Sequence, residues 1–328
     1  ALRNIYAAAS TEYPISIYYA YKQDDSSADD ERLSVGWETM LRAIIDAGFI
    51  ITGTLPMRTE LTTALKATRN ALSTSIVIVC RKQSEPKPSC MYNKFMSVLS
   101  RELEPRLVKL QASNLLPTDM AQAAIGPGME IYSRYSEVLR SNGERLNIRD
   151  ALIMINRALD DFLGKQDSDL DDESKFCLEL YKQAEFGEIK FGDAQVLATA
   201  KNVSLTRMKE RGIIESGRGL VRLLTREELK DNIDAGIWVL TQRVMYWVTE
   251  EGSAKCAAIL LEHEAKKDLV KRLAYRLYNI SERRKHADEA LCCSRPVESW
   301  HLIESELLRL KNRTGQLELR EANDDVDD

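Results

Sequence analysis

Long apolar runs, metal-ligand clusters and catalytic motifs are all missing from this sequence of 328 residues. No apolar run approaches the roughly 18 residues that a membrane helix needs, so we expect no contact with a membrane. None of the six cysteines forms a CxxC pair, and His263, His286 and His301 stand far apart, which excludes the spacing of a zinc site. The sequence also contains no GxSxG, HExxH or GxxxxGKS/T motif, and we therefore predict no catalytic residue and no metal ligand.

Glycine and proline are scarce as well. With 15 Gly and 8 Pro, a helix-rich chain is favoured over an all-β one. The 46 Lys and Arg against 51 Asp and Glu give a net charge of −5. This excludes the overall positive charge typical of many nucleic-acid-binding proteins, so any nucleic-acid site must be a local basic patch. The scattered cysteines are typical of reduced thiols, and the start of the chain leads into an amphipathic pattern rather than a secretory signal, so we expect a cytoplasmic protein.

The first part of the chain, residues 1–84, has an α/β pattern. Three segments rich in β-branched and aromatic residues predict strands at 15–21, 49–55 and 75–80. Apolar residues at helical spacing predict a helix between the first two strands, namely Trp37, Met40, Leu41, Ile44 and Ile45, with Gly48 ending it. The connection 56–74 is long for a hairpin, and connections of that length are often functional.

The rest of the chain is predicted to be mostly α. We expect a helical region at 90–166, a winged-helix-like module at 173–228, a second helical region at 229–320 and an acidic disordered tail at 321–328. Within the first helical region, the run Ile125-Gly126-Pro127-Gly128-Met129 is interpreted as a loop, because glycine and proline break helices.

The module at 173–228 is predicted from three short helices followed by a β-hairpin that turns at Gly217 to Gly219, which is the order of a winged helix-turn-helix. From Lys201 to Glu228 the stretch carries seven basic and four acidic residues, a balance of +3. Its basic residues are candidates for phosphate contacts with DNA: Arg207, Lys209, Arg211, Arg218 and Arg222. A module used only for packing or protein contacts is the alternative.

A second basic stretch, from Lys266 to Lys285, has eight basic and two acidic residues, a balance of +6. Leucines follow the opposite helix face, with Tyr275 and Tyr278 between them. This pattern is typical of a solvated helix face or of a nucleic-acid patch, and the sequence leaves both open.

Several stretches together resemble one known family. Four of them lie in the first part of the chain: Ile17-Tyr18-Tyr19-Ala20-Tyr21-Lys22-Gln23, Gly36-Trp37-Glu38-Thr39-Met40, the segment 47–60 and the segment 70–81. The others are 121–129, 132–136 and 273–278. They resemble a large prokaryotic family of adenine-specific DNA methylases, often with a zinc ribbon. The resemblance extends over nearly the whole chain and is strongest over residues 15–82.

This resemblance implies that the first strands are the last strands of a Rossmann-like methyltransferase sheet, including its antiparallel final hairpin. In the family, an FxGxG loop for S-adenosylmethionine and an Asn/Asp-Pro-Pro-Tyr catalytic loop precede the portion matched here. This chain has neither motif and lacks the ribbon cysteines. The resemblance therefore implies the C-terminal portion of such an enzyme. S-adenosylmethionine would be the cofactor of the complete enzyme and would not bind this chain alone.

The resemblance also implies partners and a substrate-facing loop. The partners are DNA and an N-terminal methyltransferase half or an upstream subunit. Arg58, Glu60 and Asn70 lie on the loop that faces the substrate cleft by this resemblance. A salt bridge and a loop hydrogen bond are the alternative roles for these three residues.

Two hypotheses of function follow. In the first, the chain contributes the cleft rim and DNA recognition to an adenine-specific DNA methyltransferase and is inactive by itself. In the second, it is a stand-alone, non-catalytic DNA-binding or scaffold subunit of a modification or defence system.

Overall fold

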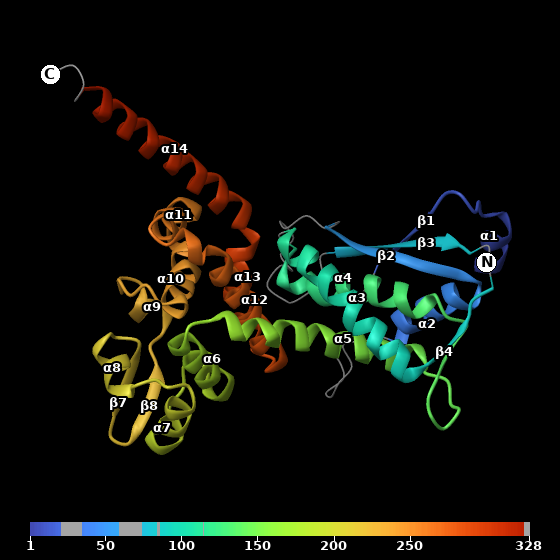
Figure 1. Ribbon diagram of the computed structural model, residues 1–328, viewed down its shortest axis with the longest axis horizontal. Coiled ribbons are helices and arrows are strands. Elements are labelled where there is room, and N and C mark those ends of the chain that lie inside the picture. The colour runs from blue at the N-terminus through green and yellow to red at the C-terminus, as the bar shows by residue number, and fades with distance from the viewer. Residues whose placement is uncertain (21–34, 59–73, 84–85, 114, 325–328) are drawn as a thin grey trace. The chain divides into compact units, whose positions relative to one another are not determined.

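The computed structural model describes residues 1–20, 35–58, 74–83, 86–113 and 115–324 (Figure 1). The chain divides into two compact units, Ala1–Phe162 and Leu163–Asp328, here called unit 1 and unit 2. Unit 1 combines small sheets with helices, and unit 2 is mostly helical, so the predicted change from α/β to mostly α is confirmed. Among the described residues, no helix has the length and apolar character that crossing a bilayer requires.

The main sheet of unit 1 has three strands. They are β1 (Ile15–Ala20), β2 (Phe49–Arg58) and β3 (Thr74–Lys82), in the order β1-β3-β2. Since β3 runs antiparallel to both neighbours, β1 and β2 run parallel to each other. The three predicted strands are confirmed, but β2 is longer than predicted. Arg58 pairs with Thr74, so the predicted connection 56–74 is shorter and comprises residues 59–73.

Helices α1 (Leu2–Ala8) and α2 (Val35–Asp46) accompany this sheet. Trp37, Leu41 and Ile44 of α2 are fully buried, as their helical spacing predicts. Gly48 follows α2 with a φ of +102°, a conformation that glycine adopts without steric cost, and it leads the chain into β2.

Unit 1 is completed by two longer helices, most of a third and a short parallel strand pair. The helices are α3 (Tyr92–Ala112), α4 (Pro117–Ser133) and α5 (Ile148–Lys165), and the strands are β4 (Ser89–Met91) and β5 (Glu137–Leu139). The prediction of a loop at Ile125–Met129 is wrong, because these residues lie inside α4.

The two glycines of that run serve close packing rather than a turn. A Cβ on Gly126 would lie 2.3 Å from the backbone nitrogen of Thr54, and one on Gly128 would lie 2.4 Å from the side chain of Ile155. Helix α4 therefore lies directly against β2 on one side and against α5 on another. Pro127 has no N–H to donate to the carbonyl four residues earlier, and the hydroxyl of Thr54 lies 3.2 Å and 3.5 Å from the carbonyls of Gln122 and Ala123.

Strand β2 contains a bulge in the segment that contacts α4. The register of β2 against β3 shifts between Ile51 and Gly53. The backbone N–H of Ile51 donates to the Ser133 hydroxyl of α4 at 3.1 Å, so α4 supplies the acceptor that a regular strand partner would supply.

Unit 2 begins with a small module, here called the 172–223 module. Its elements, in chain order, are α6 (Asp172–Ala184), β6 (Ile189–Lys190), α7 (Phe191–Ala200), α8 (Leu205–Glu210), β7 (Ile214–Gly217) and β8 (Leu220–Leu223). The strands form an antiparallel sheet in the order β6-β8-β7. The predicted helices and hairpin are thus present, together with a short additional strand, β6.

Helices make up the remainder of unit 2. They are the 3-10 turns η1 (Gln166–Asp169) and η2 (Glu264–Lys266) and the helices α9 (Arg226–Leu229), α10 (Ile237–Glu250), α11 (Ser253–Leu261), α12 (Lys267–Arg283), α13 (Ala287–Glu298) and α14 (Trp300–Asp324). Helix α14 extends to Asp324 and so includes the first four residues of the predicted acidic tail. The last four residues lie outside the described part.

Candidate nucleic-acid interface

Two helix caps and a glycine turn define the ends of the helices in the 172–223 module. Asp171 caps α6 by accepting from the backbone N–H of Ser174, and Ser204 caps α8 by accepting from that of Arg207. Gly212, at a φ of +64°, turns the chain from α8 into β7. Leu205 and Met208 on the inner face of α8 are buried, which leaves the outer face of α8 and the β7–β8 hairpin at the surface.

The five predicted DNA-contacting residues fall into two groups. Arg207, Lys209 and Arg218 are exposed, whereas Arg211 and Arg222 are partly covered and lie in ion pairs. The structure therefore distinguishes exposed cations from partly covered, ion-paired ones, a difference that the sequence does not show.

Arg222 of β8 is held by two carboxylates. Its two terminal nitrogens each lie 2.8 Å from an oxygen of Glu228, and it also pairs with Glu215. The hydrogen bonds from Arg222, followed by those from Thr225 and by the charge of Arg222, outweigh burial and lower the pKa of Glu228 to about 2. Thr225 and Glu228 form a capping box at the start of α9, so this pair anchors the hairpin to the next helix.

Arg211 joins three segments in the same way. Its Nε donates to Asp234 at 2.5 Å, and its terminal nitrogen pairs with Glu173 at the start of α6. The hydrogen bond to Asp234 is the largest contribution to a raised pKa of Arg211. Arg211 and Arg222 thus have their charges compensated within the chain, which favours a structural role for both.

Acidic residues surround one end of α8. A surface depression there is lined by Asp171 to Glu173, Asn202 to Ser204, and Arg207. Because carboxylates repel phosphates, this end of α8 is poorly suited to DNA, and Lys209 and Arg218 are not among the residues that line the depression.

The hairpin turn consists of Arg218 and Gly219 alone. Their φ angles are +54° and +78°, and Gly217 pairs with Leu220 on either side, so the loop is a two-residue turn of the type that favours Asn-Gly. An arginine in this left-handed conformation costs about 1 kcal/mol relative to a residue that tolerates it. Arg218 is exposed at this tip, so no burial in the core explains its presence.

Replacing Arg218 with Asn is expected to raise the free energy of unfolding of unit 2 by about 0.5–1 kcal/mol, because Asn tolerates a positive φ. Urea unfolding followed by hydrogen exchange in the β7–β8 hairpin measures this. Arg207→Asn is the matched control, since Arg207 is also exposed but lies in α8, where Asn lowers stability slightly. An equal response of both variants would contradict the strain at Arg218.

The second basic stretch is used inside unit 2. In and next to α12, Arg276 pairs with Asp167 at 3.1 Å and Arg272 pairs with Asp169 at 3.0 Å. Lys271 is 7% exposed and lies over the ring of Trp300. Much of this stretch therefore binds partners in the chain, and it is neither a free basic patch nor a fully solvated face.

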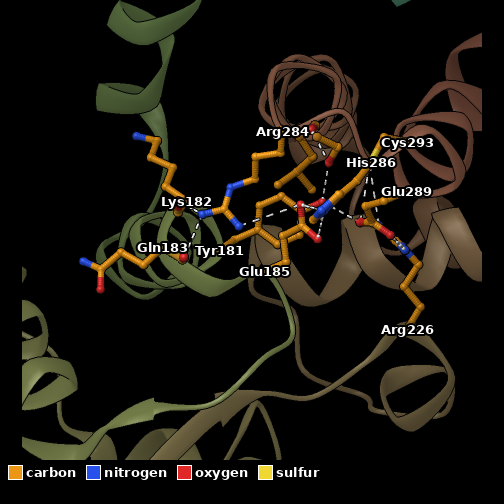
Figure 2. A network of polar contacts seen from close by, with 11 residues as sticks. Tyr181, Lys182, Gln183, Glu185, Arg226, Arg284, His286, Glu289 and Cys293 are labelled. Carbon is orange, nitrogen blue, oxygen red and sulfur yellow. Dashed lines mark hydrogen bonds and ion pairs between the residues drawn. The ribbon is translucent and has the colours of Figure 1, made fainter. Parts of the chain in front are cut away.

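A buried polar network joins the 172–223 module to the following helices (Figure 2). The Tyr181 hydroxyl of α6 lies 2.7 Å from that of Ser281 in α12 and donates to Glu289 in α13 at 2.5 Å. Arg226 of α9 binds both oxygens of the same carboxylate, with one contact at 2.7 Å. Its guanidinium also lies near the sulfur of Cys293 and over the ring of Phe186.

Burial raises the pKa of Glu289, but the hydrogen bonds and charge of Arg226 outweigh it and hold that pKa below its ordinary value. Burial, as the largest cause, raises the pKa of Tyr181 and of Cys293, so both remain protonated. An ionised pair surrounded by neutral groups is typical of a structural core contact. The sequence contains no signal for it, because Tyr181 and Glu289 are 108 positions apart.

Two further residues in Figure 2 close the end of α6. Arg284 donates to the backbone carbonyls of Lys182 and Gln183 at 2.5 Å and 2.7 Å, which supplies partners for the last carbonyls of the helix. The ring of His286 lies 2.8 Å from a carboxylate oxygen of Glu185. The network and this cap fix the module to α12 and α13.

The structure provides no side-chain positions for the other predicted site residues. Arg58 ends β2, and its side chain is not described, while Glu60 and Asn70 lie outside the described residues. Within the described part of the chain, no group of three or more His, Cys, Asp or Glu side chains could hold a metal ion.

Comparison with known proteins adds one finding. The family named Domain of unknown function (DUF8807) matches residues 171–319, which lie within unit 2 and include the 172–223 module, the polar network and α12. No curated protein and no solved structure matches the chain.

Proposed function

We propose that this chain is the C-terminal portion of an S-adenosylmethionine-dependent, adenine-specific DNA methyltransferase. In this proposal unit 1 contributes the end of the methyltransferase sheet and the rim of the substrate cleft. The 172–223 module is a winged helix that contacts DNA. The cofactor and the catalytic loop belong to a partner polypeptide or a preceding half.

The observation that carries the proposal is the main sheet of unit 1. Its strand β3 lies between β1 and β2 and runs antiparallel to both, which fits the antiparallel final hairpin of a methyltransferase sheet. Two stretches that resemble the methylase family, 47–60 and 121–129, also meet in space. Gly126 of α4 lies against Gly53 and Thr54 of β2, so the resemblance concerns one packed body.

The element order of the 172–223 module supports the DNA contact. Helix, strand, two helices and a two-stranded hairpin follow one another, with the short first strand paired to the hairpin. The exposed cations Lys209 and Arg218 lie on α8 and at the hairpin tip, the two elements with which such modules approach a duplex.

We expect the purified chain to bind duplex DNA with a salt-dependent affinity and to transfer no methyl group by itself. Arg218→Glu should weaken binding and lower the slope of log K against log salt by about 0.9, the value of one phosphate contact. Arg309→Glu on α14 makes the same charge change outside the module and should leave the slope unchanged. Fluorescence anisotropy with labelled duplex at several salt concentrations measures both.

Methylation is tested by mixing the chain with a polypeptide that carries the FxGxG and Pro-Pro-Tyr motifs, and we expect adenine methylation only in the mixture. DNA binding without methylation in any mixture would favour the stand-alone DNA-binding subunit. Micromolar binding of S-adenosylmethionine to this chain alone, measured by calorimetry, would contradict the division of roles.

A further inference from the structure

An aromatic side chain lies next to the hairpin tip of the 172–223 module. Phe191, the first residue of α7, donates its backbone N–H to the carbonyl of Gly219 in the turn at 2.8 Å. Its neighbour Lys190 pairs with Leu220 across the sheet. Phe191 is 42% exposed, so part of its ring is accessible to a ligand. Figure 1 shows α7 beside the β7–β8 hairpin.

Three cations accompany this aromatic residue in the fold. Arg218 is the other residue of the turn, Lys190 precedes Phe191, and Lys209 donates its ammonium to the carbonyl of Ser216 at 2.7 Å, which holds it against the hairpin. All three are exposed, and none has an ion pair with a carboxylate of the described residues, in contrast to Arg211 and Arg222. The cluster Lys190, Phe191, Lys209 and Arg218 is here called the wing-tip cluster.

We infer that the wing-tip cluster binds DNA at an unpaired base, with Phe191 stacked on that base and the three cations on the flanking phosphates. This inference rests on the proposed function and deepens it. A half-exposed aromatic ring beside uncompensated cations is the combination that binds unstacked bases, because cations hold the backbone and the ring replaces a neighbouring base. An adenine methyltransferase must take its target out of the stack, which leaves an unpaired partner base in the duplex.

The alternative of a contact through cations alone does not account for Phe191. Lysine and arginine suffice for phosphate binding, and the strained Arg218 is explained by it. A half-exposed phenylalanine next to the turn adds stacking affinity for a ligand with a flat apolar face. In DNA that face is accessible at an unpaired base and covered in a regular duplex.

The test compares two probes, a fully paired duplex and the same duplex with one abasic site, which leaves the opposite base unpaired. We expect the full chain to bind the abasic duplex more tightly. Phe191→Ala should reduce this preference about tenfold, the effect of losing one stacking contact. Val196→Ala is the matched control, because Val196 is an apolar residue of the same helix, 70% exposed and five positions away. It should leave both affinities unchanged.

A second variant reports the contact directly and guards against a folding defect. Phe191→Trp keeps a flat ring, and its additional fluorescence should be quenched by the abasic duplex and much less by the paired one. The inference is overturned if the parent chain binds both probes equally, or if saturating abasic duplex leaves the added fluorescence of Phe191→Trp unquenched. If no variant binds either probe, the proposed DNA contact itself has failed. If the paired duplex binds through Arg218 while Phe191→Ala has no effect on either probe, only the wing-tip inference has failed.

Discussion

Replacing Gly126 with Ala is expected to destabilise unit 1 by about 3 kcal/mol, because the new methyl group meets backbone rather than a movable side chain. Its Cβ would lie 2.3 Å from the nitrogen and 2.4 Å from the hydroxyl of Thr54, and 3.0 Å from the carbonyl carbon of Gly53. Relief requires α4 to move away from β2. That movement also lengthens the bond from the Thr54 hydroxyl to the Gln122 carbonyl and the bond from Ile51 to Ser133.

Hydrogen exchange of the β2 and β3 amides in urea measures this loss without interference from unit 2. Gly53→Ala is the matched control, since it makes the same chemical change in β2 at a position where a Cβ meets nothing within 4 Å. Its expected cost is below about 1 kcal/mol. Equal protection of the β2 amides in Gly126→Ala and in the parent chain would show that α4 does not approach β2 this closely.

The same position shows how far sequence reasoning reaches in this fold. The strands and α2 were predictable, because runs of β-branched residues and the spacing of Trp37, Leu41 and Ile44 are local signals. The glycines and proline of α4 have a local reading as helix breakers, and that reading is wrong. The role of Gly126 and Pro127 depends on Thr54, about 70 positions earlier, and that of Gly128 depends on Ile155 of α5, so no local pattern contains these partners.

At the candidate interface, the number of charges along the sequence likewise does not show which arginines are free to bind a ligand. Along the sequence Arg211, Arg218 and Arg222 form one basic stretch. In the fold Asp234 and Glu228 compensate two of them, while Arg218 is exposed at the hairpin tip and has no carboxylate partner among the described residues. The hairpin itself was predictable from Gly217 to Gly219. The partners of its cations were not, because ion pairing depends on the placement of α6 and α9.

The largest loss in unit 2 is expected from Glu289→Ala, at about 3–5 kcal/mol, because it leaves a buried guanidinium without its counter-charge. The side chains of Arg226 and Glu289 are 13% and 17% exposed, so water compensates little for the missing partner. The variant also removes the acceptor of the Tyr181 hydroxyl. Tyr181→Phe, which removes that donor and its contact with the Ser281 hydroxyl but leaves the ion pair in place, should cost about 1 kcal/mol.

Glu298→Ala is the matched control, since Glu298 lies on the same helix α13 but is exposed. Its unfolding free energy should stay within about 0.5 kcal/mol of that of the parent chain. Urea unfolding followed by hydrogen exchange in α6 and α13 measures all three variants. A cost of Glu289→Ala no larger than that of Glu298→Ala would show that Arg226 finds water or another partner when Glu289 is removed.

The pH dependence of stability gives the same contact a second, independent readout. The folded chain holds the pKa of Glu289 below its ordinary value, so the folded state binds fewer protons than the unfolded state near that value. The contribution of the pair is therefore fully present above the unfolded pKa of about 4.3 and is lost as the pH falls through the folded pKa.

Glu289→Gln keeps the shape of the side chain but has no proton to bind. The difference in unfolding free energy between the parent chain and Glu289→Gln should be constant from pH 7 to about pH 5 and shrink in more acidic solution, because protonation then removes the charge from the parent chain as well. A difference that stays constant down to about pH 3 would show that the ionised carboxylate of Glu289 contributes nothing that its amide does not.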